Sequence, residues 1–211
     1  MGRNQEIFDK LEDAAMRIHS DVLVACQTKA VFDALNARLL EEPLGTTPYN
    51  RVFVVIIHAL MSQLSLAVSR VYDPDNGRDR LTLPFVLSAL EAFSGSSEFV
   101  DRFSRQRPEF ADLVSELIAD ISAWIRSTEF NDAKFRLKSL RDAALAHSLS
   151  TTPDEPTFFQ VYLLLDRARI LAERIVMVLH NGDASHDTTK LGQRAVDFWV
   201  NALEFARNPG Q

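Results

Sequence analysis

The sequence predicts an all-α protein, and three of its features point to that fold class. Glycine and proline contribute only 15 of the 211 residues, so turns are few and the elements between them are long. Leucine and alanine number 49, against 35 for valine, isoleucine and threonine, a balance that favours helices over strands. Apolar residues recur at spacings of three and four along most of the chain. We therefore expect one domain over residues 1–211, a bundle of about six to seven helices.

The N-terminal region carries the first of these helical stripes. Its apolar positions are Phe8, Leu11, Ala15, Ile18, Val22 and Ala25, followed by Val31, Leu35 and Leu39. Their spacing places them on the buried side of an amphipathic helix. Pro43, Gly45 and Pro48 then mark a loop that ends this helical region.

The segment from Val52 to Val71 is apolar on nearly all sides, and we interpret it as a central core helix that other helices surround. Its polar residues would be costly at the centre of a bilayer, which argues against a membrane span. They are His58, Ser62, Gln63, Ser65, Ser69 and Arg70. We interpret His58 as a buried histidine bonded to a serine or a backbone group, with a position in a cleft as the alternative.

Two further helices follow. Thr82 and Pro84 form a helix-start signal, and the pair Ser94 and Gly95 ends that short helix after Phe93. Pro108 opens the next helix, whose apolar stripe has no interruption. That stripe consists of Phe110, Leu113, Val114, Leu117, Ile118, Ile121, Trp124 and Ile125.

The C-terminal third of the chain contains three more stripes. The first consists of Phe130, Ala133, Leu137, Leu140, Ala144 and His147, and the polar sequence STTPDEPT follows it as a loop. The second consists of Val161, Leu164, Leu165, Ala168, Leu171, Ala172, Ile175 and Leu179, and Asn181 with Gly182 caps its end. The last helix runs from about Thr188 to Ala206, with Leu191, Ala195, Phe198, Trp199, Ala202 and Phe205 on its packing side.

Charge and cysteine content limit the functional classes. A net charge of −6 argues against a large nonspecific nucleic-acid surface but leaves room for a local basic pocket. The single cysteine, Cys26, excludes an internal disulfide and a cysteine-rich zinc site, and we interpret it as a small core residue. The N-terminal residues read as an amphipathic helix and not as a signal peptide, so we expect a cytoplasmic protein without membrane contact.

Two sequence stretches carry a resemblance to a known family. The run LRDAALAH from Leu140 to His147 resembles the motif of HEPN-superfamily helical domains, an arginine followed by a histidine after four to six residues. The stretch FVVIIHALMSQLSLAVSRVYDPDNGRDRLTLPFVLSAL resembles the abortive-infection branch of HEPN-like proteins. Together they cover about residues 51–148.

The resemblance implies a metal-independent endoribonuclease in a phage-defence or toxin–antitoxin context, with RNA as substrate, an antitoxin protein as partner and no cofactor. It also implies a homodimer whose two motif helices form a shared cleft. His147 would serve as general acid or base, because imidazole titrates near neutral pH. Arg141 would stabilise charge on the phosphate oxygens, and Asp142 would orient the imidazole or hold a helix end.

The spacing of the motif supports a composite site. On a regular helix six residues correspond to a rise of ~9 Å and a rotation of ~240°, so Arg141 and His147 point apart. Arg141 also leans toward the helix start. Convergence therefore requires a distorted helix end or a second protomer, and we predict a homodimer.

Other interpretations stay open. His147 can close an apolar stripe at a helix C-terminus while Arg141 is surface charge. The domain can then be a noncatalytic module that binds a protein or nucleotide partner, or a purely structural dimer. The HNGDASHD loop brings His180, Asp183, His186 and Asp187 together, either as a metal site or as a loop that ends a helix. Arg102, Arg105 and Arg107 form a basic group that contacts phosphates or covers a solvated surface.

Overall fold

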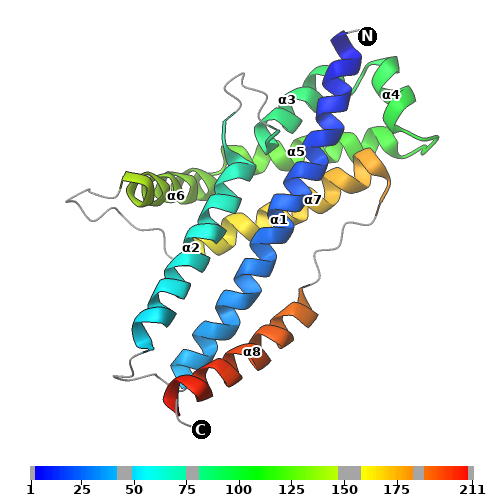
Figure 1. Ribbon diagram of the computed structural model, residues 1–211. Helices are drawn as coiled ribbons and strands as arrows, with labels where there is room; N and C mark the ends of the chain where they lie inside the picture. Colours follow the sequence, from blue (N-terminus) through cyan, green and yellow to red (C-terminus); the bar gives the residue numbers. More distant parts are fainter. Residues whose placement is uncertain (1–2, 42–48, 75–80, 147–157, 183–187, 209–211) are drawn as a thin grey trace.

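The computed structural model describes residues 3–41, 49–74, 81–146, 158–182 and 188–208, and within these ranges it contains eight α-helices and no strand. Figure 1 shows their arrangement. They are α1 (Arg3–Glu41), α2 (Asn50–Tyr72), α3 (Leu83–Phe93), α4 (Ser97–Phe103), α5 (Phe110–Arg126), α6 (Thr128–Ala146), α7 (Phe158–His180) and α8 (Thr189–Arg207). The all-α prediction is confirmed, and the described helices exceed the expected six to seven by one.

The long helix α1 organises the molecule. Its 39 residues extend over ~58 Å, and the sequence from Arg3 to Glu41 contains no glycine or proline that would kink it. Figure 1 shows α2 running beside α1, α7 crossing its N-terminal half, and α8 lying along its C-terminal half. Helix α1 therefore packs against α2, α7 and α8 along its length.

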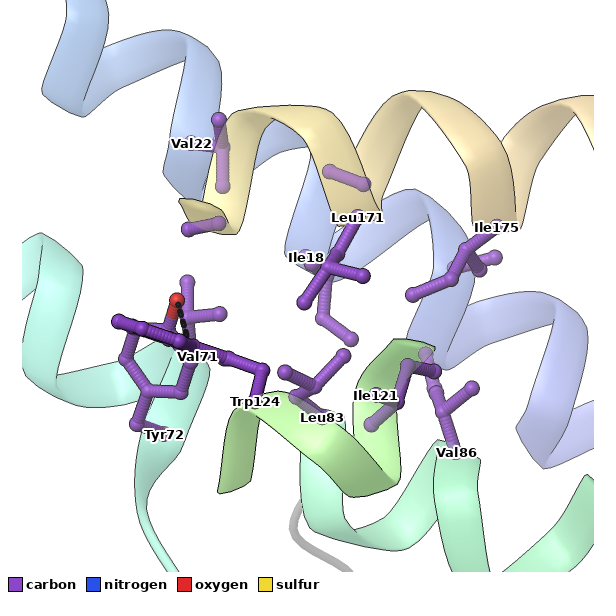
Figure 2. Close-up of a cluster of buried hydrophobic side chains, with 14 of the residues drawn as sticks. Ile18, Val22, Val71, Tyr72, Leu83, Val86, Ile121, Trp124, Leu171 and Ile175 are labelled. Atoms are coloured by element: carbon purple, nitrogen blue, oxygen red, sulfur yellow. Dashed lines mark hydrogen bonds between the residues drawn. The ribbon is translucent and has the colours of Figure 1, made fainter. Parts of the chain in front are cut away.

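The larger core lies where α3, α4, α5, α6 and α7 pack around the N-terminal half of α1 and the C-terminal half of α2; we call this part the body. Figure 2 shows its centre, where Ile18, Val71, Leu83 and Ile121 meet. All four side chains are at least 98% buried, and burial of this kind is the main favourable term in folding.

A buried polar pair links three helices inside the body. The indole nitrogen of Trp124 donates to the Tyr72 hydroxyl at 3.2 Å, which Figure 2 draws as a dashed line. The Tyr72 hydroxyl in turn donates to the carbonyl oxygen of Leu164 at 2.9 Å. Burial raises the pKa of Tyr72 well above its usual range, so the neutral phenol stays available as a donor. The pair fixes α2, α5 and α7 relative to one another.

A second, smaller core joins the C-terminal half of α1, the N-terminal half of α2 and α8; we call this part the arm. Its buried residues are Ala34, Leu35, Phe53, Ala195, Trp199, Leu203 and Ala206. Trp199 lies 5.8 Å from the Phe53 ring, centroid to centroid, and its indole nitrogen donates to the Val31 carbonyl oxygen at 3.2 Å. The arm therefore consists of parts of three helices.

Most of the predicted apolar stripes are confirmed. The stripe from Phe8 to Ala25 is at least 98% buried at every position, and the stripe from Val161 to Leu179 is at least 96% buried. The stripe predicted for α5 also faces the core. Helix α7 ends where expected, because Asn181 takes the left-handed conformation with φ of 53°.

Two predictions about packing are wrong. Helix α2 is not surrounded along its whole length: a third of its most apolar window is buried, and Val52, Val54 and Val55 are 53%, 45% and 67% exposed. By length and composition α2 is also the one described helix that could cross a bilayer, a test that core helices of soluble proteins pass as well. In α8, Phe198 and Phe205 are 60% and 63% exposed, because Leu203 and Ala206 complete the buried face instead.

Helix α4 is the element that the sequence pattern did not predict. It has only seven residues, too few for a periodic stripe to stand out. The Ser96 hydroxyl caps it by accepting a hydrogen bond from the Phe99 backbone nitrogen at 3.2 Å. Phe99 and Phe103 are both buried against Phe8 of α1. Local capping and two aromatic side chains therefore define this short helix.

Candidate functional site

Helix α6 carries the first part of the motif, and its start is well defined. The Ser127 hydroxyl accepts a hydrogen bond from the Phe130 backbone nitrogen at 3.1 Å. The Ser127 carbonyl oxygen accepts a second one from the Asn131 side-chain amide at 2.9 Å. Serine is a preferred N-cap because its oxygen satisfies an orphan backbone donor. These bonds fix where α6 leaves α5.

Three apolar residues then anchor α6 against the body. Phe130, Ala133 and Leu137 are at least 97% buried. The Phe130 ring lies 5.1 Å from the Tyr72 ring and 5.5 Å from the Trp124 ring, in edge-to-face contacts that are favourable for aromatic pairs. The first ten residues of α6 therefore set its direction.

The motif residues occupy the other end of α6. Arg141 and Asp142 lie in the last two turns of the helix, which Figure 1 shows at the edge of the molecule, beyond α2. The side chains of both residues lie outside the described part of the chain, and so does the whole of His147. The predicted convergence of Arg141, Asp142 and His147 stays a prediction.

A line of basic residues leads to the motif along α6, in addition to the residues predicted from the motif. Lys134, Lys138 and Arg141 have the spacing i, i+4, i+7, which places the three positions on one face of the helix. Lys138 is exposed, and the ammonium of Lys134 lies 5.3 Å from the centre of the Phe130 ring. The spacing alone could have revealed this basic line.

The electrostatics of the basic line come from α6 itself and from the end of α2. Partial burial lowers the pKa of Lys134, while the nearby carboxylate of Asp73 acts in the opposite direction. Arg136 lies on a different side of α6, where it pairs with Asp132 at 3.4 Å. In a chain of net charge −6, the described side chains of Lys134 and Lys138 thus place two positive charges along this face of α6.

The arginine group before α5 has a structural role. Arg102 pairs with Asp9 and Glu12 of α1 at 2.7 and 2.6 Å. Arg107 donates to the carbonyl oxygens of Met177 and Val178, and Arg105 donates to that of His180. These guanidinium groups satisfy the last carbonyls of α7, where cations are favoured. Arg105 is nevertheless exposed, as the solvated-surface alternative expects, whereas Arg102 and Arg107 are partly buried.

Two other candidate residues have clear positions. His58 is exposed on α2, so its interpretation as a buried histidine is wrong, for the same reason that the N-terminal half of α2 is uncovered. Cys26 is 91% buried, as expected of a core residue. Burial raises the pKa of the Cys26 thiol to about 11, which keeps it protonated and unreactive near neutral pH.

The metal hypothesis for the HNGDASHD loop is only partly open to inspection. Asp183, His186 and Asp187 lie outside the described residues. Among the residues that are described, no group of three or more histidine, cysteine, aspartate or glutamate side chains could hold a metal ion. His180 terminates α7, and its carbonyl oxygen is the acceptor for Arg105 at 2.9 Å.

A pocket of about 290 Å³ lies at the N-terminal end of α6, between α5 and α7. Its lining residues are Asp120, Ala123, Trp124, Ser127, Glu129, Arg167, Ile170 and Leu171. The Arg167 guanidinium lies 5.5 Å from the Trp124 ring centre, and Asp120 pairs with Arg174. Because α6 is ~28 Å long, this pocket is separate from the motif at the other end of the helix.

Comparison with known proteins places the chain in a family. No curated protein and no solved structure matches it significantly. The family model HEPN_AbiU2, described as AbiU2, matches residues 6–201, which include every described helix except the last turns of α8 and the first residues of α1. The match confirms the resemblance to abortive-infection HEPN-like proteins, and the chain belongs to the HEPN_AbiU2 family.

Proposed function

We propose that residues 1–211 form one HEPN-like domain that cleaves RNA without a metal ion, at a composite site of Arg141, Asp142 and His147 in a homodimer cleft. Membership of the HEPN_AbiU2 family over residues 6–201 supports the HEPN-like fold. Fold does not fix function, so the proposal depends on the chemistry of the residues themselves.

The observation that carries the proposal is the basic line of α6. Lys134 and Lys138 precede Arg141 at positions on the same helical face, and that face leads to the C-terminal end of α6, at the edge of the molecule (Figure 1). Phosphate contacts from lysine and arginine supply most of the affinity of proteins for RNA and position the backbone. The basic line can thus bind the RNA backbone next to the proposed catalytic residues.

The reaction uses the RNA's own 2′-hydroxyl as nucleophile. One imidazole removes the 2′-hydroxyl proton while the oxygen attacks phosphorus, and the 5′-oxygen of the next nucleotide leaves with a proton from a conjugate acid. The products are a 2′,3′-cyclic phosphate and a 5′-hydroxyl. His147 provides the proton transfer, and Arg141 meets the negative charge that grows on the nonbridging oxygens. Asp142 of one protomer orients the imidazole across the cleft.

We propose a phage-defence or toxin–antitoxin role on the basis of the family alone. An antitoxin protein would then be the partner that neutralises the nuclease. We propose action in the cytoplasm, where RNA is available, without membrane attachment.

The test is RNA cleavage by purified full-length protein and by His147→Ala and Arg141→Ala variants. We expect the His147→Ala change to lower the cleavage rate by about 10²–10⁴-fold, the usual contribution of a general acid or base. We expect Arg141→Ala to lower it by about 10²–10³-fold through lost charge stabilisation. Cleavage is followed on a labelled single-stranded RNA in the presence of EDTA.

Arg126→Ala is the matched control, because Arg126 is an exposed arginine in the last turn of α5 and lies outside the motif. It should leave the rate unchanged. Full activity of either motif variant refutes the site assignment. An unmutated protein that binds RNA or a protein partner but does not cleave RNA indicates the noncatalytic module instead.

A further inference from the structure

Helix α6 carries an exposed phenylalanine within its basic line. Phe135 is 66% exposed, directly after Lys134 and one helical turn before Lys138. The buried side of α6 is filled by other residues, and Phe135 does not belong to the body core. A single exposed phenylalanine is ordinary by itself, so the side chains around this one decide what it can bind.

The helix surface around Phe135 combines one ring with several cations. The nearest positions are three and four residues away, and Lys134 and Arg136 flank the ring on its two sides. Those nearest positions are Asn131, Asp132, Lys138 and Ser139. The Asp132 carboxylate accepts hydrogen bonds from Arg136 at 3.4 Å and from Gln160 at 3.1 Å, so its charge is engaged locally. The exposed ammonium of Lys138 is therefore the cation that a ligand of Phe135 meets first.

Two further carboxylates lie along the basic line, and each has another assignment. The Asp73 carboxylate, at the end of α2, acts on Lys134 and not on the residues farther along α6. Asp142 occupies the position four residues after Lys138, where the proposed site uses it to orient the imidazole. An anionic ligand at Phe135 is thus attracted by Lys138 from the side that leads to the motif.

A second exposed ring stands at the start of α7. Phe159 is 72% exposed, and it directly precedes Gln160 in the sequence. The hydrogen bond from Gln160 to Asp132 holds the start of α7 next to the turn of α6 that precedes Phe135. Two neighbouring helices therefore each present an aromatic side chain to solvent in this region.

We propose that Phe135 is a base-stacking residue, on which an unpaired nucleobase of RNA lies flat while Lys138 binds the adjacent phosphate. Side chains one turn apart have Cβ atoms ~5–6 Å apart, so one nucleotide can reach both. A base inside a duplex is already stacked and paired, so the site selects unpaired RNA. The inference rests on the proposed function and names the part of the substrate that is recognised.

The composition of the site favours RNA over a protein partner. Lysine is depleted in the buried core of protein–protein interfaces. Sites for single-stranded nucleic acid instead combine basic side chains, which follow the backbone, with aromatic rings, on which the bases stack. Phe135 with Lys138 one turn away is such a combination.

The first experiment measures affinity for a labelled single-stranded oligoadenylate by fluorescence anisotropy, in the His147→Ala background that prevents cleavage. Phe135→Ala should raise the dissociation constant by about tenfold or more, the usual loss for one stacked base. Phe135→Leu should lose nearly as much, because leucine keeps an apolar side chain but has no ring. Phe198→Ala is the matched control, since Phe198 is 60% exposed on α8, and it should leave the affinity unchanged. Circular dichroism checks that the variants keep the helical content.

Salt dependence separates stacking from phosphate contact. Stacking releases no counterions, so Phe135→Ala should have the same slope of log affinity against log salt as the protein with Phe135. A hairpin RNA of the same length, whose bases are paired, should bind both proteins equally well.

The second experiment places a reporter at the site by Phe135→Trp. Trp124 and Trp199 are both buried, so the new indole is the exposed one. Binding of the oligoadenylate should quench the emission of this indole and should be as tight as binding to the protein with Phe135, or tighter. Phe198→Trp should show no quenching. Dextran sulfate, a polyanion without bases, should bind Phe135→Trp without quenching it.

The outcomes separate this inference from the nuclease. Phe135→Ala with the affinity of Phe198→Ala, or emission of Phe135→Trp that does not respond to RNA, overturns the stacking site and leaves RNA cleavage to be judged by its own assay. Loss of affinity in Phe135→Ala, with no RNA cleavage by the unmutated protein, supports the stacking site and refutes the nuclease. Loss of dimer mass in Phe135→Ala at unchanged RNA affinity, measured by sedimentation equilibrium, identifies a second copy as the occupant and overturns the proposal.

Discussion

At the scale of single residues, the proposed function depends on which lysine and arginine side chains are exposed and which are engaged in packing the helices together. Arg102 and Arg107 are partly buried and hold neighbouring helices together, Arg102 through carboxylates of α1 and Arg107 through helix-end carbonyls of α7. Lys138 on α6 lies exposed instead, on the face that leads to Arg141. A cation that is available to solvent is one that can bind a phosphate group.

We predict that Lys138→Ala weakens RNA binding about threefold to tenfold and reduces the slope of log affinity against log salt by about 0.7, the value for one contact to a single strand. The affinity is measured by fluorescence anisotropy across a salt series, with the His147→Ala background to prevent cleavage. Lys190→Ala on α8 removes another exposed lysine and should change neither quantity. Identical salt slopes in the two variants would show that the basic line does not contact phosphate.

At the scale of the elements, α7 is held at its C-terminal end by side chains from a distant segment. Arg107 donates to the carbonyl oxygens of Phe103, Ser104, Met177 and Val178, and its guanidinium lies 5.2 Å from the Phe110 ring centre. One side chain therefore ties the end of α4, the start of α5 and the last turn of α7. Half-burial of this residue strengthens its hydrogen bonds relative to those on an open surface.

We predict that Arg107→Ala lowers the free energy of unfolding by about 2 kcal/mol, because helix-end carbonyls lose charged donors. For a chain of this size the loss corresponds to a fall in Tm of about 5 °C. Differential scanning calorimetry measures both. Arg105→Ala removes a single bond, to His180, and should cost less than half as much. Equal costs for the two arginines would contradict the role assigned to Arg107.

The elements also show how far sequence reasoning reaches. Stripes in α1, α5 and α7 were predictable because residues such as Ile18, Leu117 and Leu171 repeat with the helical period and face one core. The period does not say what covers the opposite side, so the exposure of Val55 on α2 could not be predicted. In α8, Phe198 reads as a packing residue, yet Trp199 and Leu203 fill the arm core.

The candidate site was predictable in part, for related physical reasons. The motif from Arg141 to His147 is a local pattern and could be found by its spacing. The line of Lys134 and Lys138 follows the same helical period and was available in the sequence. Contacts between distant segments were not, such as those of Arg107 with α7, because no local pattern encodes a neighbour about 70 residues away.

At the scale of the whole molecule, the two cores differ in size and in what protects them. The body core gathers residues from seven helices, whereas the arm core rests on three. Small cores bury a lower fraction of their surface and open more readily. The arm should therefore be the less stable region of an isolated chain.

We predict that Trp199→Ala, which removes the largest side chain of the arm core, costs about 3–5 kcal/mol locally and opens the arm while the body stays folded. Hydrogen exchange followed by mass spectrometry should show loss of protection in α8 and in the N-terminal half of α2, with α5 and α7 unchanged. Trp124→Ala, the comparable change in the body, should lower protection throughout. Uniform loss in the Trp199→Ala protein would mean that arm and body unfold as one unit.

The unbroken helix α1 connects the body and the arm rigidly. A rod of 39 residues without glycine or proline resists bending, so the arm cannot swing relative to the body about this element. A partner that binds the arm in a complex therefore also fixes the orientation of the body. The direction of α6 relative to the arm is in this way already set in the folded chain, before a substrate binds.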